Sequence, residues 1–243
     1  MPSVPSAEKS LRPLDEPVIA RRLLAEVTGL EESEVVERLR GEQRRLGAGV
    51  ADDLCRADVR HHVWSDDLRR FYEATDAFLF ESFVWNRQTE KHAMRRWIGD
   101  FLRHRGPSGR QVLTFGDGLG FESTYLARAG HVVTYFEVGA KSRAFAREVF
   151  LLNDVGVTVV DRDDALTAGR FDVVVCLDVL EHVETHDRVV AALQSLEVAR
   201  LRQVAAAHVE VRAPLERAAQ EIAASRSGTS IMKKPASCSL VSA

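Results

Sequence analysis

Apolar side chains recur at helical spacing through the first part of the chain. From Pro17 to about Leu46 they stand three or four positions apart, with an interruption near Thr28 and Gly29. Apolar residues at this spacing form one face of a helix, so the segment is predicted to be a helical hairpin. Residues 1–17 contain prolines and charges without an apolar period, and we expect a disordered lead there.

A second helical stretch is predicted from about Asp66 to Arg105, which completes an N-terminal helical region over residues 18–105. Most aromatic side chains of the region lie in this stretch: Phe71, Tyr72, Phe78, Phe80, Phe83, Trp85, Trp97 and Phe101. Two interpretations are open. The rings either pack the helices onto a sheet or form a lid over a substrate.

After the turn Gly106-Pro107-Ser108-Gly109 the pattern changes to short β-branched runs separated by helical segments. Four strands are expected, at Gln111–Phe115, Val132–Phe136, Val157–Val160 and Phe171–Leu177. Helices are expected at Phe121–Ala129, Ser142–Asn153 and Asp187 to about Leu196. Alternating strands and helices predict an α/β core over residues 106–196, with a parallel sheet, helices on both faces and right-handed crossovers.

Composition narrows the classes of partner. The chain has 243 residues and a net charge of −3, so no global basic field favours nucleic acid. Its three cysteines lie far apart without a CxxC pair, which indicates neither a disulfide framework nor a zinc site. No secretion signal or long apolar run is evident. We therefore expect a soluble cytoplasmic protein with no membrane partner.

A glycine-rich loop follows the first predicted strand. Gly116, Gly118 and Gly120 alternate around Asp117, and a helix begins at Phe121. Glycines at these positions let the backbone turn sharply and approach a ligand where helix N–H groups point outward. A tight strand-to-helix turn without a ligand could use the same pattern.

Acidic residues follow the later strands in an order that points to a nucleoside. Glu137 ends the second strand, where a carboxylate can accept hydrogen bonds from two ribose hydroxyls. After the third strand, Asp164 could accept a bond from an adenine amino group while Ala165 leaves room for the ring; a charged surface turn explains this pair equally well. The fourth strand ends at Leu177 and Asp178.

Together these segments resemble the class I S-adenosylmethionine (SAM) dependent methyltransferase family over about residues 95–195. The resemblance implies a Rossmann-like fold, SAM as cofactor and methyl transfer to a small-molecule acceptor. It further implies that Gly116, Asp117, Gly118 and Gly120 flank the methionine part of SAM. Glu137 is then expected to hold the ribose, Asp164 and Ala165 to meet the adenine, and Leu177 and Asp178 to border the pocket.

Thr114 departs from the family pattern, which has an acid two residues before the first glycine. Asp117 could substitute for that acid in recognising the amino group. The main rival interpretation is a nicotinamide-binding Rossmann fold, because residues 118–123 differ by one residue from GxGxxG and Glu137 would serve its ribose too. That alternative leaves the segment from Phe171 to Val183 unexplained.

Catalysis needs in-line positioning of the acceptor, with a base only if the acceptor carries a proton of high pKa. His182 follows the fourth strand, titrates in a useful range and is the candidate catalytic residue, although such a histidine is often structural. The remaining histidines lack the spacing of metal ligands, so no metal is predicted.

Residues 197–243 fit the family less well. Further strands are expected there, yet the segment is rich in Ala, Arg, Val and Glu, and we predict an atypical helical or disordered segment. It is either a divergent extension or the product of a reading-frame slip. The alternative to an active enzyme is therefore a truncated or frameshifted, catalytically silent remnant that at most binds SAM or a protein partner. Oligomeric state is not encoded in any pattern we can interpret.

Overall fold

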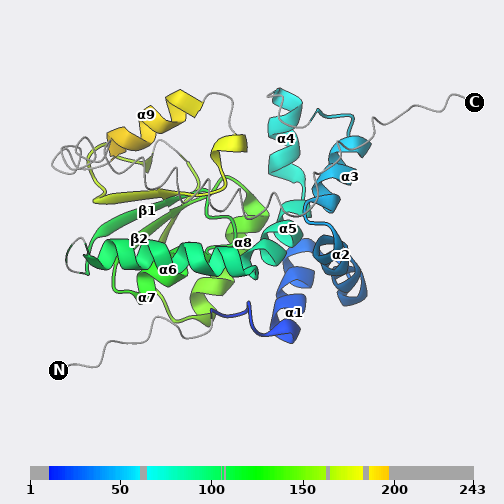
Figure 1. Ribbon diagram of the computed structural model, residues 1–243. Coiled ribbons are helices and arrows are strands. Elements are labelled where there is room, and N and C mark those ends of the chain that lie inside the picture. Colours follow the sequence, from blue (N-terminus) through cyan, green and yellow to red (C-terminus); the bar gives the residue numbers. More distant parts are fainter. Residues whose placement is uncertain are drawn as a thin grey trace, which may run out of the picture. The chain divides into compact units, whose positions relative to one another are not determined.

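The computed structural model describes residues 11–60, 65–104, 106, 108–162, 165–182 and 186–196 (Figure 1). The chain divides into two units, Met1–Glu197 and Val198–Ala243, and every described residue belongs to the first. Within the described ranges, six helices precede the sheet: α1 (Pro17–Thr28), α2 (Glu32–Arg44), α3 (Ala48–Arg56), α4 (Asp66–Ala74), α5 (Ala77–Asn86) and α6 (Thr89–His104).

Strands and helices then alternate, as the sequence predicts. The order is β1 (Gln111–Phe115), α7 (Phe121–Arg128), β2 (Val132–Phe136), α8 (Ala140–Leu152), β3 (Val157–Val160), β4 (Val173–Cys176), the short 3-10 turn η2 (Leu180–His182) and α9 (His186–Leu196). Three of the four strands have the predicted bounds, and β4 is shorter than predicted at both ends.

The described strands form one parallel sheet in the order β3-β2-β1-β4. Phe115 pairs with Phe136 on one side and with Cys176 on the other, so three strands end at the same edge. The chain leaves β1 toward β2 and later returns to the other side of β1. This reversal lies between β1 and β4, which is where open α/β sheets bind ligands, beyond the carboxyl ends of the strands.

Helices cover both faces of the sheet. Along β1, Val112 packs with Phe121 and Phe145 from α7 and α8, while Leu113 packs with Leu196 from α9. Figure 1 shows α6 and α7 on one side of the sheet and α9 on the other. The Rossmann-like α/β architecture with a preceding helical region, expected from the sequence, is confirmed.

Residues 11–17 differ from the disordered lead expected over residues 1–17, whose first ten residues lie outside the described part of the chain. Leu11 and Leu14 are buried in the main hydrophobic core, and the backbone of Arg12 exchanges hydrogen bonds with the side chain of Asn153 at the end of α8. The prediction was wrong for these residues because a turn can be anchored by one or two buried side chains, which leave no apolar period in the sequence.

The second helical stretch, predicted from about Asp66 to Arg105, consists of the three helices α4, α5 and α6. The Ser65 hydroxyl accepts a hydrogen bond from Leu68 N at the start of α4, and the Thr75 hydroxyl accepts one from Ala77 N at the start of α5. These capping bonds satisfy backbone groups at new helix starts and so favour separate short helices.

Candidate functional site

The glycine loop joins β1 to α7 with three residues in the left-handed region: Gly116, Gly118 and Gly120 have φ of 71°, 60° and 77°. A Cβ on Gly118 would meet no atom within 4 Å, whereas one on Gly120 would lie 2.8 Å from Phe150 and 2.9 Å from Ala146. Gly118 therefore borders open space, while Gly120 permits close packing of the loop on α8.

Asp117 turns toward its own helix. Its carboxylate accepts hydrogen bonds from Ser123 N at 2.7 Å and Glu122 N at 3.2 Å, which satisfies the first turn of α7. Burial and the charge of Glu122 raise the pKa of Asp117 well above its ordinary value. Thr114 is buried and its hydroxyl lies 2.6 Å from that of Ser123. The Asp117 carboxylate is thus already engaged and Thr114 has no carboxylate, so neither residue offers a free carboxylate to an amino group.

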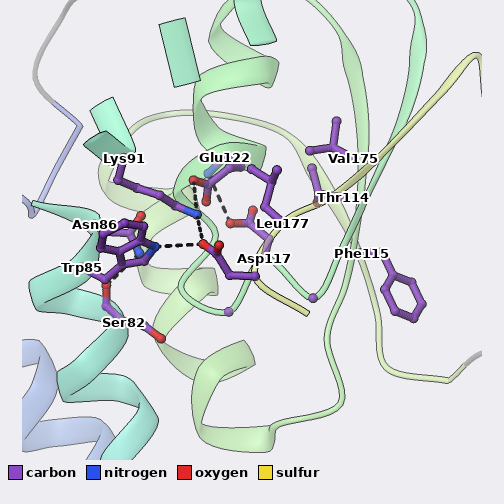
Figure 2. Close-up of a pocket in the computed structure, with 13 residues that line it drawn as sticks. Ser82, Trp85, Asn86, Lys91, Thr114, Phe115, Asp117, Glu122, Val175 and Leu177 are labelled. Atoms are coloured by element: carbon purple, nitrogen blue, oxygen red, sulfur yellow. Dashed lines mark hydrogen bonds and ion pairs between the residues drawn. The ribbon is translucent and has the colours of Figure 1, made fainter. Parts of the chain in front are cut away.

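A small cavity of about 80 Å³ lies beside the loop. Lys91 at the start of α6 places Nζ 2.8 Å from Asp178 Oδ2, and Trp85 Nε1 of α5 donates to the same oxygen at 2.8 Å. Figure 2 shows Lys91, Trp85 and Glu122 turned toward this cavity beside Asp117. The cavity is thus lined both by the helices α5 and α6 and by residues at the carboxyl ends of β1 and β4.

Buried charges of opposite sign surround Glu122 of α7. Lys91 Nζ lies 3.3 Å and Arg95 Nε 3.2 Å from its Oε1, and all three side chains are at most 5% exposed. Burial works against the charged carboxylate, but Arg95 and Lys91 outweigh it and lower the pKa of Glu122 to about 2. Burial likewise works to lower the pKa of Lys91, yet Glu122, Asp178 and Asp117 together raise it. Both groups are therefore charged at neutral pH.

A larger cleft of about 650 Å³ continues from the loop and lies within the size range of small-molecule pockets. Glu137, directly after β2, lines it and accepts hydrogen bonds from Gly139 N at 2.8 Å and Gly118 N at 3.2 Å. Burial raises the pKa of Glu137 despite these bonds. The carboxylate is held at the cleft wall by the glycine loop and by the start of α8.

His182 in η2 lines the same cleft under α4 and α5. Its Nδ1 lies 3.1 Å from the Tyr72 hydroxyl, and the rings of Tyr72 and Phe78 stand edge-on to the imidazole at centroid distances of 5.5 and 5.8 Å. The ring centroids of Tyr72 and Phe78 lie 5.2 Å apart. We call these three side chains the ring cluster.

The structure brings most of the predicted site residues together. Gly116, Asp117, Gly118, Leu177 and Asp178 line the small cavity, and Glu137 and His182 line the larger cleft. Gly120 lines neither and has a packing role. Ala165 is exposed and also lines neither, and Asp164 lies outside the described residues. The expected contacts with a bound ligand stay predictions.

Sequence reasoning missed Lys91, Glu81 and Ser82, which line these cavities from α5 and α6. Only the spacing of Lys91 and Arg95, one helical turn apart, could have indicated a shared partner. Phe80 and Phe83 belong to the core, as the packing interpretation of the aromatic residues predicts, whereas Tyr72, Phe78 and Trp85 line the cleft. A lid over a substrate stays a prediction.

Within the described ranges no helix is long and apolar enough to cross a membrane. The same residues contain no group of three or more His, Cys, Asp or Glu side chains that could hold a metal ion.

A family model described as a methyltransferase domain matches residues 85–221, more than half of the chain. A ubiquinone biosynthesis O-methyltransferase of Cronobacter sakazakii is 38% identical over 149 residues, covering 57% of this chain and 58% of that protein. One of the same description from Azotobacter vinelandii is 33% identical over 123 residues, covering 46% and 52%. The chain therefore spans little more than half the length of these curated relatives.

Solved structures similar to this chain include the magnesium protoporphyrin IX methyltransferase of Synechocystis PCC 6803 with bound SAM. It shows a TM-score of 0.41 and 25% identity over 54% of this chain and 65% of that one. A Haemonchus contortus phosphoethanolamine N-methyltransferase has a TM-score of 0.45 and 18% identity over 56% and 34%.

Proposed function

This chain belongs to the methyltransferase domain family, and from that premise we propose that it transfers a methyl group from SAM to a small-molecule acceptor. The single observation that carries this proposal is the convergence of the glycine loop, Glu137 and Asp178 at the carboxyl edge of the sheet. Two cavities that share lining residues, among them Gly116, Gly118 and Asp178, lie there; one is small and lined by charged residues, the other large and mainly apolar.

The small cavity suits the amino-acid end of SAM, which carries an ammonium and a carboxylate. Asp178 supports an ammonium, and its position is fixed by Trp85 and Lys91. Lys91 Nζ has up to three N–H donors and lines the cavity, so it suits the carboxylate. In this proposal Asp178 takes over the task of the acid that Thr114 replaces, because Asp117 is already bonded to Ser123.

The larger cleft suits the nucleoside and the acceptor. Open space at Gly118 lets a ligand approach the backbone, and Glu137 is positioned to accept hydrogen bonds from ribose hydroxyls. When bound, SAM supplies an electrophilic methyl group on a sulfonium. The ring cluster of Tyr72, Phe78 and His182 would then orient the acceptor toward that methyl group and exclude water.

Calorimetric titration with SAM and with its demethylated product, S-adenosylhomocysteine, tests the cofactor half of the proposal. Glu137→Ala is expected to weaken binding of both by about 100-fold, because two hydrogen bonds to a charged group are lost. Glu148→Ala, a matched change at an exposed position of α8, should bind like the unaltered chain.

Folded protein that binds neither ligand would contradict the proposal and favour the silent-remnant hypothesis. Binding without transfer of a labelled methyl group to any component of a small-molecule extract would contradict its catalytic half only.

A further inference from the structure

The larger cleft contains a carboxylate, that of Glu81, which no described residue engages. Among the acids lining the cleft, Glu73 pairs with Arg69 at 2.9 Å, Asp178 pairs with Lys91, and Glu137 accepts backbone hydrogen bonds. Glu81 of α5 takes part in no hydrogen bond or ion pair with any residue that the structure describes. Among the described acids of this cleft, Glu81 is therefore the one available to an incoming ligand.

The surroundings of Glu81 make its negative charge costly. The side chain is partly buried, and Glu42 of α2 stands nearby, itself only 3% exposed and held by Gly47 N at 2.6 Å and Gly49 N at 2.7 Å. Burial, reinforced by the Glu42 charge, raises the pKa of Glu81 to about 7. A positively charged group beside Glu81 would relieve both effects.

Other features of the cleft favour the same kind of ligand. The faces of aromatic rings attract cations, and the ring cluster and Trp85 line the cleft together with Glu81. The lining cations are already engaged: Arg69 by Glu73 and Lys141 by Asp76 at 3.4 Å. An anionic acceptor would therefore meet no unpaired cation among the described residues of the lining.

We propose that the methyl acceptor carries a basic amine, which Glu81 binds as an ammonium against the ring cluster and which receives the methyl group. This inference rests on the proposed function and extends it to a substrate class. It differs from the O-methylation that the names of the curated relatives state.

The transfer balances without a further reactant. Glu81 accepts one proton from the ammonium, as an N–H bond breaks and an O–H bond forms, and the nitrogen regains its lone pair. That lone pair forms the new C–N bond as the bond between methyl carbon and sulfonium sulfur breaks, and its electron pair stays on sulfur as a thioether. The methylated ammonium leaves, and Glu81 releases its proton to water.

Three probes that share a phenol ring separate the possibilities: tyramine ends in an ammonium, 4-ethylphenol in a methyl group and 4-hydroxyphenylacetate in a carboxylate. Binding of each is measured calorimetrically to the full chain saturated with S-adenosylhomocysteine. Tyramine is expected to bind about tenfold more tightly than 4-ethylphenol, because a partly desolvated charged hydrogen bond is gained. With labelled SAM, mass spectrometry should locate the methyl group of the tyramine product on nitrogen.

Glu81→Gln keeps the size of the side chain and should remove the preference for tyramine while binding of S-adenosylhomocysteine is unchanged. Glu34→Gln, an exposed change on α2, is the matched control. Equal affinity for the three probes, absence of tyramine binding, transfer to the phenol oxygen, or a preference that survives Glu81→Gln would overturn the inference. If the unaltered chain did not bind S-adenosylhomocysteine, that result would instead contradict the proposed function itself.

Discussion

Single residues of the glycine loop have separate tasks despite their similar backbone conformations. Gly118 and Gly120 both have positive φ, but only Gly120 is enclosed by side chains of α8. The sequence pattern treats the two glycines alike. The packing around each one decides which glycine protects the fold and which leaves space for a ligand.

Alanine at these two positions should separate folding from binding. Gly120→Ala combines left-handed strain with a clash against Phe150, so we expect a loss of about 2–4 kcal/mol of unfolding free energy. Gly118→Ala adds only the strain, about 1 kcal/mol, yet its methyl group occupies the proposed ligand space. Urea unfolding and S-adenosylhomocysteine titration of both variants measure the two effects. Similar stability losses in both variants would show that the packing argument is wrong.

At the scale of elements, buried charges link α6 to α7. Lys91 and Arg95 stand one helical turn apart on α6 and share Glu122 of α7. Such a network is expensive to break because the remaining charges stay buried without a counterion. The N-terminal helical region is thereby fixed to the helix that begins at the glycine loop.

Glu122→Gln is expected to destabilise the protein by about 3–5 kcal/mol at pH 7, since two buried cations lose their partner. The pKa of Glu122 is lowered to about 2, so its contribution is present above its unfolded value near 4.5 and is lost as pH falls toward 2. The raised pKa of Asp117 has the opposite effect on stability. Its contribution to the free energy of unfolding is present below about pH 4 and is lost as the pH rises above that value.

Chemical unfolding between pH 2 and 7 checks both statements. The unaltered chain should lose the Glu122 contribution at the acidic end, and Glu122→Gln should lack that decline. Glu34→Gln, which removes an exposed ion pair with Arg38, serves as the control and should cost less than about 1 kcal/mol. A similarly small cost for Glu122→Gln would mean that the buried network does not stabilise the fold.

At the scale of the described unit, the cleft is shared between the helical region and the sheet. Residues of α4 and α5 form one wall and residues that follow β1, β2 and β4 form the other. The segment before α1 belongs to the same core through Leu11 and Leu14. Residues distant in sequence therefore have to fold together before the cleft exists.

Leu14→Ala tests whether this first segment is part of the folded unit. Leu14 is only 1% exposed, and removing its side chain should cost about 2–5 kcal/mol, as for other buried leucines. Val18→Ala is the comparison: Val18 is 55% exposed, and its loss should change stability by less than about 0.5 kcal/mol. Thermal and urea unfolding measure both. If Leu14→Ala unfolds like Val18→Ala, the segment is not anchored in the core.

The strands, their parallel arrangement and the glycine loop follow from local patterns in the sequence. Apolar period and glycine position are local properties, and three strands have the bounds that those properties predict. The position of Glu137 at the end of a parallel strand placed it at the ligand-binding edge, and the family resemblance implied that Asp178 borders the pocket there. His182 could be placed at that edge, but the Tyr72 hydroxyl beside it could not.

Which polar residues share a partner depends on how the folded chain packs in three dimensions. Lys91 and Asp178 are 87 positions apart, and no local pattern states that they meet. Glu81 is one glutamate among many in the sequence, and it becomes distinctive only because folding buries it near Glu42 and gives it no counterion among the residues that the structure describes. Charge and burial act through space, so pairing and desolvation follow from the packing of the helices on the sheet.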